Sequence, residues 1–114
     1  MAQTDNILNQ SIEIATKLQK LIELSNKAKT RDEKEKNAMD IIMWQVYAAK
    51  ARITLEQRYR LKIVQLEEQG LSNASAESRA KTESEWALYK KIELLYSLGE
   101  ECVRMAKISI GNSY

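Results

Sequence analysis

Closely spaced carboxylates are the feature of this sequence with the clearest potential for chemistry. Carboxylates three or four positions apart share a face of a helix, and helical bundles that bind divalent metals repeat such pairs on several helices. Asp32 and Glu35 are the single pair with this spacing, and the sequence contains no histidine to complete a site. Glu67 and Glu68 are adjacent, so they point in different directions around a helix. We therefore predict no metal site.

Nucleophilic chemistry has as little support in the sequence. Cys102 is the only cysteine, which excludes an intramolecular disulfide and a paired-cysteine zinc site. There is no histidine to act as a base for a serine or cysteine, which leaves lysine as the alternative base, and no glycine-rich phosphate loop occurs. Cys102 falls among apolar residues at helical spacing, where cysteine usually fills a core. We predict no catalytic residue, no cofactor and no enzyme activity.

Basic residues gather between residues 50 and 62, where five bases stand against one acid, Glu56, with Tyr47 and Tyr59 nearby. Bases interleaved with aromatic residues can contact phosphates of nucleic acid or another anion. The competing interpretation is a solvated face whose bases pair with acids, and we favour it because the five bases do not share one side of a helix. The candidate anion strip comprises Lys50, Arg52, Arg58, Arg60, Lys62, Arg79 and Lys81.

Long helices must position all of these residues, because the 114 residues include no proline and only three glycines. Proline interrupts a helix, and glycine weakens one by roughly 1 kcal/mol relative to alanine. Thr30 and Glu33 have the spacing of an N-terminal capping box, which predicts a turn near residues 27 to 30. The alternative there is one unbroken helix to Gln69.

Two further signals divide the second half of the chain. Gly70 is suited to a left-handed helix end, and the serines and asparagine that follow it can cap the next helix. Thr82 and Glu85 repeat the capping-box spacing just before Trp86. The predicted helices span about residues 5–28, 31–69, 74–81 and 83–109.

Apolar residues cover nearly every side of the predicted helix between residues 38 and 49. A helix of that kind must be covered on every side. We therefore predict an all-α fold, a single domain over residues 1–114 built as an antiparallel helical bundle or hairpin with long helices, and a homo-oligomer. Each tryptophan anchors either the core, which we favour, or an interface. The candidate residues for an oligomer or partner interface are Ile41, Ile42, Trp44, Val46, Tyr47, Trp86, Tyr89 and Tyr96.

Charge and hydropathy limit the class of protein further. The formal net charge of +2 comes from 18 basic and 16 acidic residues, so the surface is mixed and does not demand non-specific binding to nucleic acid. The longest uncharged run, residues 41–49, is far shorter than the roughly 20 residues that span a bilayer, and no apolar signal core precedes it. We expect a soluble cytoplasmic protein with no membrane partner.

The segment GLSNASAESRAKTESEW, residues 70–86, follows a long predicted helix that ends LEEQ. With the last helix it resembles small all-helical proteins of phages and prophages, over about residues 40–108. In those proteins a long helix leads to a Gly-Ser turn, an Ala-Glu-Arg-x-x-Ala-Lys segment, a capped acidic start with an aromatic residue, and a final long helix. Arg79 and Lys81 stand in the basic part of that pattern, whereas Ser78 and Trp86 depart from its commonest forms. The first 30 residues add a helix outside it.

Proteins of that kind are often encoded beside phage recombination and replication genes, so the resemblance implies an accessory role and no known reaction. We expect a non-enzymatic accessory protein in the host cytoplasm. It would bind an unidentified protein partner, either in DNA recombination or replication or by inhibiting a host factor. Two alternatives remain open: a helical dimer that binds nucleic acid directly, and an oligomer that binds a small anionic ligand.

Overall fold

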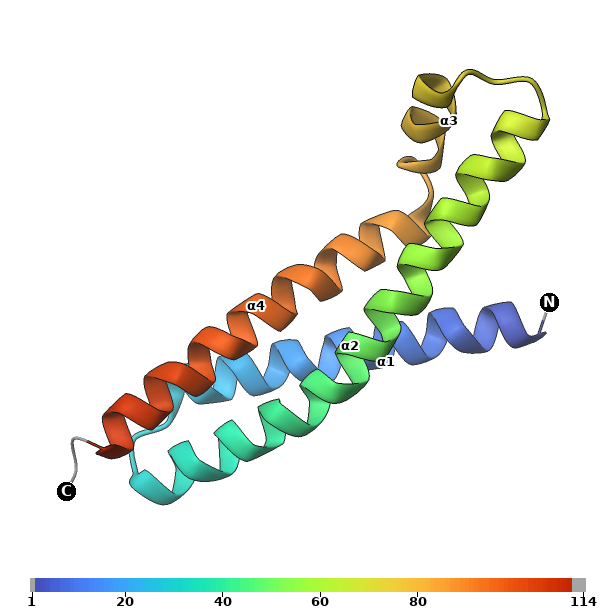
Figure 1. Ribbon diagram of the computed structural model, residues 1–114. Coiled ribbons are helices and arrows are strands. Elements are labelled where there is room, and N and C mark those ends of the chain that lie inside the picture. Colours follow the sequence, from blue (N-terminus) through green and yellow to red (C-terminus); the bar gives the residue numbers. More distant parts are fainter. Residues whose placement is uncertain (1, 112–114) are drawn as a thin grey trace.

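The chain is all-α over the part that the computed structural model describes, which is the backbone of residues 2–111 and the side chains of residues 6–109 (Figure 1). No strand occurs within that range, so the predicted all-α class is confirmed. Each helix begins and ends within three residues of the predicted bounds. The four helices are α1 (Ala2–Lys27), α2 (Arg31–Glu68), α3 (Asn73–Ala80) and α4 (Ser84–Gly111).

The turn between α1 and α2 is fixed by the predicted capping box. Thr30 Oγ1 accepts a hydrogen bond from the Glu33 amide at 3.2 Å, and the Glu33 carboxylate accepts one from the Lys29 amide at 3.0 Å. These two bonds satisfy amides near the start of the helix, and a cap of this kind is typically worth about 1 kcal/mol. The chain therefore breaks where Thr30 predicts, and the alternative of one unbroken helix is wrong.

The connections on either side of α3 both lie within a residue or two of where the sequence predicts them, but only the first is capped as predicted. Gly70 has a φ of +98°, the left-handed conformation that favours glycine, and Ser72 caps α3 by accepting from the Ser75 amide. The predicted box at Thr82 is wrong, because Thr82 Oγ1 donates to the Arg79 carbonyl at 2.7 Å. Only residues 81–83 separate α3 from α4, so the Thr82 hydroxyl reaches back to the end of α3.

The three long helices form the core, with α2 and α4 antiparallel and in extensive contact along their lengths (Figure 1). The helix α1 packs against both of them, and α3 packs against the far end of α2. Small and large apolar side chains from α1, α2 and α4 make one continuous cluster. Its largest fully buried members are Leu18, Ile41, Leu55 and Ile92.

Helices α2 and α4 approach each other closely at Gly99. A Cβ atom at this position would lie 3.2 Å from both Ile41 Cγ2 and Gln45 Nε2. The Gln45 amide in turn donates to the Tyr96 carbonyl at 3.1 Å. Glycine thus leaves space in α4 for an isoleucine and a glutamine of α2, and this packing fixes which side of α2 faces inward.

The molecule is long and thin. Its extents along the three principal axes are 62, 29 and 17 Å, and its radius of gyration is 17.6 Å. A compact domain of this length has a radius of gyration of about 13 Å. A shape of this kind cannot enclose a helix on all sides, so one side of α2 remains uncovered by the rest of the chain.

Two adjacent leucines of α4 test the packing, because Leu95 is 6% exposed and Leu94 is 59% exposed. We expect Leu95→Ala to lower the free energy of unfolding by about 2–5 kcal/mol, since it removes buried methyl groups and leaves a cavity. Leu94→Ala should change it by less than about 0.5 kcal/mol. Urea denaturation followed by circular dichroism measures both. Equal losses for the two variants would contradict this orientation of α4.

Candidate interaction surface

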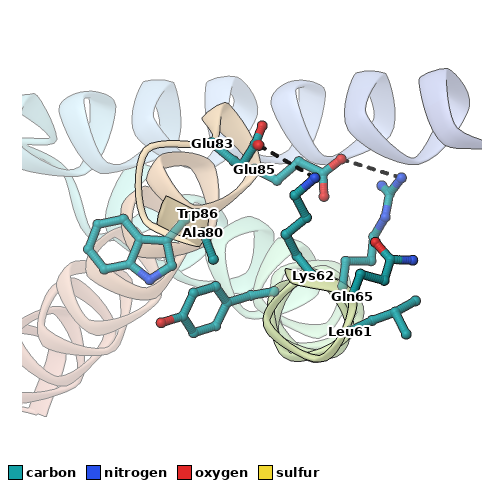
Figure 2. A pocket seen from close by; sticks show the side chains of 9 residues that line it. Leu61, Lys62, Gln65, Ala80, Glu83, Glu85 and Trp86 are labelled. Carbon is teal, nitrogen blue, oxygen red and sulfur yellow. Dashed lines mark ion pairs between the residues drawn. The ribbon is translucent and has the colours of Figure 1, made fainter. Parts of the chain in front are cut away.

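The candidate anion strip is largely occupied by interactions within the chain. Arg58 Nη2 lies 3.4 Å from a Glu85 carboxylate oxygen, with both side chains mostly buried. Lys62 Nζ lies 3.8 Å from Glu83. Glu83 lies just before α4 and Glu85 lies in its first turn, so these pairs hold the second half of α2 against the junction of α3 and α4. Figure 2 shows Lys62 reaching toward Glu83.

Two more members of the strip face groups of the same chain. Arg60 Nη2 lies 3.0 Å from Glu56 on the same helix. The Arg52 guanidinium lies over the Tyr96 ring, 5.3 Å from its centroid, where a cation and an aromatic face attract one another. These contacts turn the guanidinium groups of Arg60 and Arg52 toward the chain itself and not toward an external phosphate.

The remaining three bases, Lys50, Arg79 and Lys81, are exposed. Among the residues that the structure describes, Lys50 and Arg79 form no ion pair, while the Lys81 ammonium lies 5.9 Å from the centre of the Trp86 ring. Lys50 is on α2 whereas the other two are at the end of α3. The structure therefore does not bring the seven bases together as one binding surface.

An open pocket lies where the ion pairs of Arg58 and Lys62 meet the ring of Trp86 (Figure 2). Its lining is mixed, because Glu83 and Glu85 supply as many negative charges as Arg58 and Lys62 supply positive ones. Since these four charges are already paired, the pocket offers no unbalanced charge to an ionic ligand.

The aromatic residues of α4 join this junction to the core. Trp86 is half-buried, and its ring lies tilted relative to that of Tyr59, with 6.4 Å between the ring centroids.

The pKa values of two residues of α4 are shifted. Partial burial raises the pKa of the Tyr89 hydroxyl, and a hydrogen bond with Glu93 and the negative charge of Glu93 add to the rise. A hydrogen bond from Lys90 lowers the pKa of Glu93. Both groups therefore keep their ordinary charge state at neutral pH.

The predicted interface residues divide into buried and exposed members. Ile41 is fully buried in the core, so it is a core residue and cannot contact a partner. Trp44, Trp86, Tyr89 and Tyr96 are half-buried, and Trp44, Tyr89 and Tyr96 pack against the main cluster. The exposed members are Ile42, Val46 and Tyr47.

These three belong to a longer apolar surface on α2, which we call the outer stripe. Each of its eight residues is between 44% and 71% exposed. At 1.5 Å per residue the outer stripe extends about 38 Å along the helix. It consists of Met39, Ile42, Met43, Val46, Tyr47, Ile53, Leu61 and Val64.

The outer stripe lies opposite the side of α2 that packs against the chain. Two positions along an α-helix correspond to about 200° of rotation. Met39 precedes the buried Ile41 by two positions. The same offset relates Val46 to Ala48, Ile53 to Leu55, and Val64 to Leu66. The helix α2 is therefore apolar on two opposite sides, of which the chain itself covers one.

The interface prediction from sequence missed five members of the outer stripe: Met39, Met43, Ile53, Leu61 and Val64. A signal for three positions was present, because Met39, Val46 and Ile53 recur every seven residues. That repeat is hidden by a second apolar set on the inner side of the same helix. Which of the two sides faces inward depends on Gly99 and the rest of α4.

Within residues 2–111, no helix is long and apolar enough to cross a membrane. Over the same described range, no group of three or more histidine, cysteine, aspartate or glutamate residues is arranged to hold a metal ion.

The Arg58–Glu85 pair gives a test of the charge arrangement. Glu85→Gln should lower the free energy of unfolding by about 1–2 kcal/mol, because it leaves the charge of a mostly buried guanidinium uncompensated. The matched control is Glu13→Gln on the exposed surface of α1, which should change it by less than about 0.5 kcal/mol. Thermal unfolding of both variants provides the comparison. A Glu85→Gln protein as stable as the control would show that the pair does not hold α2 to α4.

No protein-family model, curated protein or solved structure matches this chain. Its function therefore has to be inferred from the surfaces described above.

Proposed function

We propose that this protein is a non-enzymatic accessory protein that acts by binding another protein chain through the outer stripe of α2. The observation that carries the proposal is the extent of that stripe, in which eight large apolar residues on one side of one helix are each at least 44% exposed. Single exposed apolar residues are normal on a protein surface, but many of them gathered on one side of a helix are typical of an interaction site.

The energetics of the outer stripe support binding to an apolar surface of another protein. Burial of apolar area stabilises a complex by about 25 cal/mol per Å² before the costs of association are subtracted. Water covers this area when the chain is alone. An amphipathic helix laid along α2 would bury it by the same spacing of three and four residues that operates within the bundle.

The phage context of the proposal comes from the resemblance of residues 40–108 to small helical phage proteins. In that context the protein would assist DNA recombination or replication, which is our first choice, or inhibit a host factor. Both roles require contact with another protein and neither requires a reaction. They are consistent with a sequence that contains no histidine and a single cysteine.

Direct binding of nucleic acid, or of a small anion, is the alternative and has less support. It requires bases that are free and close together, whereas Arg58, Arg60 and Lys62 are paired with carboxylates of the chain. The exposed bases Lys50 and Arg79 lie on different helices.

Light scattering separates these two functions. We expect the solution mass to be unchanged when short single-stranded and double-stranded DNA is added at low salt, because the strip offers few unpaired charges. A mass increase that added salt reverses would contradict the proposal, since phosphate contacts release counterions. In that case the variant Lys50→Ala/Arg79→Ala should lose the increase, and the variant Lys20→Ala, on α1, should keep it.

A further inference from the structure

We infer that the partner on the outer stripe is a second copy of this chain, with the two α2 helices antiparallel about a two-fold axis that passes between residues 51 and 52. This inference rests on the proposed function, because it names the chain that occupies the proposed binding surface; a recombination or host partner would then bind the dimer through its remaining surfaces. Three observations support it: the exposed area, the shape of the chain, and the positions of the polar residues that lie on the same side of α2 as the outer stripe.

The exposed area matches what a stable dimer needs. With about half of each residue accessible, the eight residues of the outer stripe expose on the order of 800 Å² per chain, which is what each partner buries in a standard-size interface. Crystal contacts and weak encounters bury less. A single copy of the stripe is therefore large enough to hold a dimer without help from other helices.

The shape of the chain explains why its own helices leave this side uncovered. The least extent of the molecule is 17 Å, which leaves no layer of helices outside α2. Two copies packed through α2 would place both stripes in the interior. A symmetric pair also buries the same surface on both chains, as the interface of a two-fold dimer must.

Five residues of the outer stripe, together with the polar Lys50, Gln57 and Arg60, have the heptad spacing of a helix seam, in which positions alternate by four and three residues. One set of positions is Met39, Val46, Ile53 and Arg60, and the other is Met43, Lys50, Gln57 and Val64. In antiparallel pairing a residue of one set lies across from a residue of the other set. About an axis between residues 51 and 52, the facing pairs are Met39 with Val64, Met43 with Arg60, Val46 with Gln57, and Lys50 with Ile53.

The polar residues at these heptad positions favour antiparallel over parallel pairing of the two α2 helices. In a parallel dimer each position meets its own copy, so Lys50 would face Lys50 and Arg60 would face Arg60 in an apolar seam. Like charges placed opposite one another are unfavourable. In the antiparallel dimer each faces an apolar residue, along which its aliphatic stem can lie while the charged end reaches water. Arg60 also keeps its partner Glu56.

The first test is the solution mass of a variant with charges in the seam. We expect wild type to have twice the chain mass of 13.1 kDa. Met39→Glu/Val46→Glu should weaken the association by at least about 100-fold, because each chain would bury two carboxylates that face Val64 and Gln57 of the second copy and no base. Circular dichroism checks that the variant is still folded. The matched control is Lys107→Glu, an exposed change on α4, which should remain a dimer.

The second test measures the direction of pairing by disulfide cross-linking and does not depend on a disruptive variant. Both proteins carry Cys102→Ala, and one also carries Met39→Cys while the other carries Val64→Cys. An antiparallel dimer predicts that the mixture cross-links between the two proteins and that neither protein cross-links to itself. Self-linking of each protein alone, with none between them, would show a parallel dimer and overturn the inference.

A wild-type chain that stays monomeric at all concentrations would also overturn the second-copy inference. The proposed function then depends on a separate result. An identified protein from host extract should be retained by tagged wild type and by Lys107→Glu, but not by Met39→Glu/Val46→Glu. Retention would leave the outer stripe as a binding surface for a different chain. Equal retention by all three proteins would contradict the proposed function as well.

Discussion

One constraint governs this structure: α2 is apolar on two opposite sides, and the remaining helices of the chain can cover one of them. The side that α4 covers is selected by close packing, because Gly99 admits Ile41 and Gln45 within 3.2 Å of where a Cβ would lie. Once Ile41 is turned inward, the residues two positions before the buried ones are turned outward. The position of the outer stripe is thus a direct consequence of the contact between α2 and α4.

The charged residues take part in the same arrangement. Arg58 and Lys62 lie on the second half of α2, where α1 gives less cover, and they pair with Glu85 and Glu83 at the start of α4. Pairs of this kind contribute little when exposed and more when partly buried. The two ion pairs hold the far end of α2 against α3 and α4. They do not involve the outer stripe, which remains the apolar surface for binding. Bases that looked available for phosphate in the sequence therefore act within the fold.

Local signals allowed much of the fold to be predicted from the sequence. The breaks at Thr30 and Gly70 follow from capping and from a left-handed conformation, which depend on a few neighbouring residues. Thr82 failed as a cap because a short connection brought its hydroxyl to the end of α3 instead. The candidate surface was harder to predict. The spacing of apolar residues along α2 does not predict that Ile41 is buried while Met39 is exposed. That difference depends on packing against α4, which lies some fifty residues further along the chain.

The most direct test of the claim that a second copy covers the outer stripe uses the chain's own methionines. Met39, Met43 and Met105 are 71%, 49% and 53% exposed in the single chain, and hydrogen peroxide converts accessible methionine to its sulfoxide. At high protein concentration, Met39 and Met43 should oxidise more slowly than Met105 on α4, and dilution should remove the difference, as followed by peptide mass spectrometry. Equal rates for all three methionines at every concentration would contradict the account.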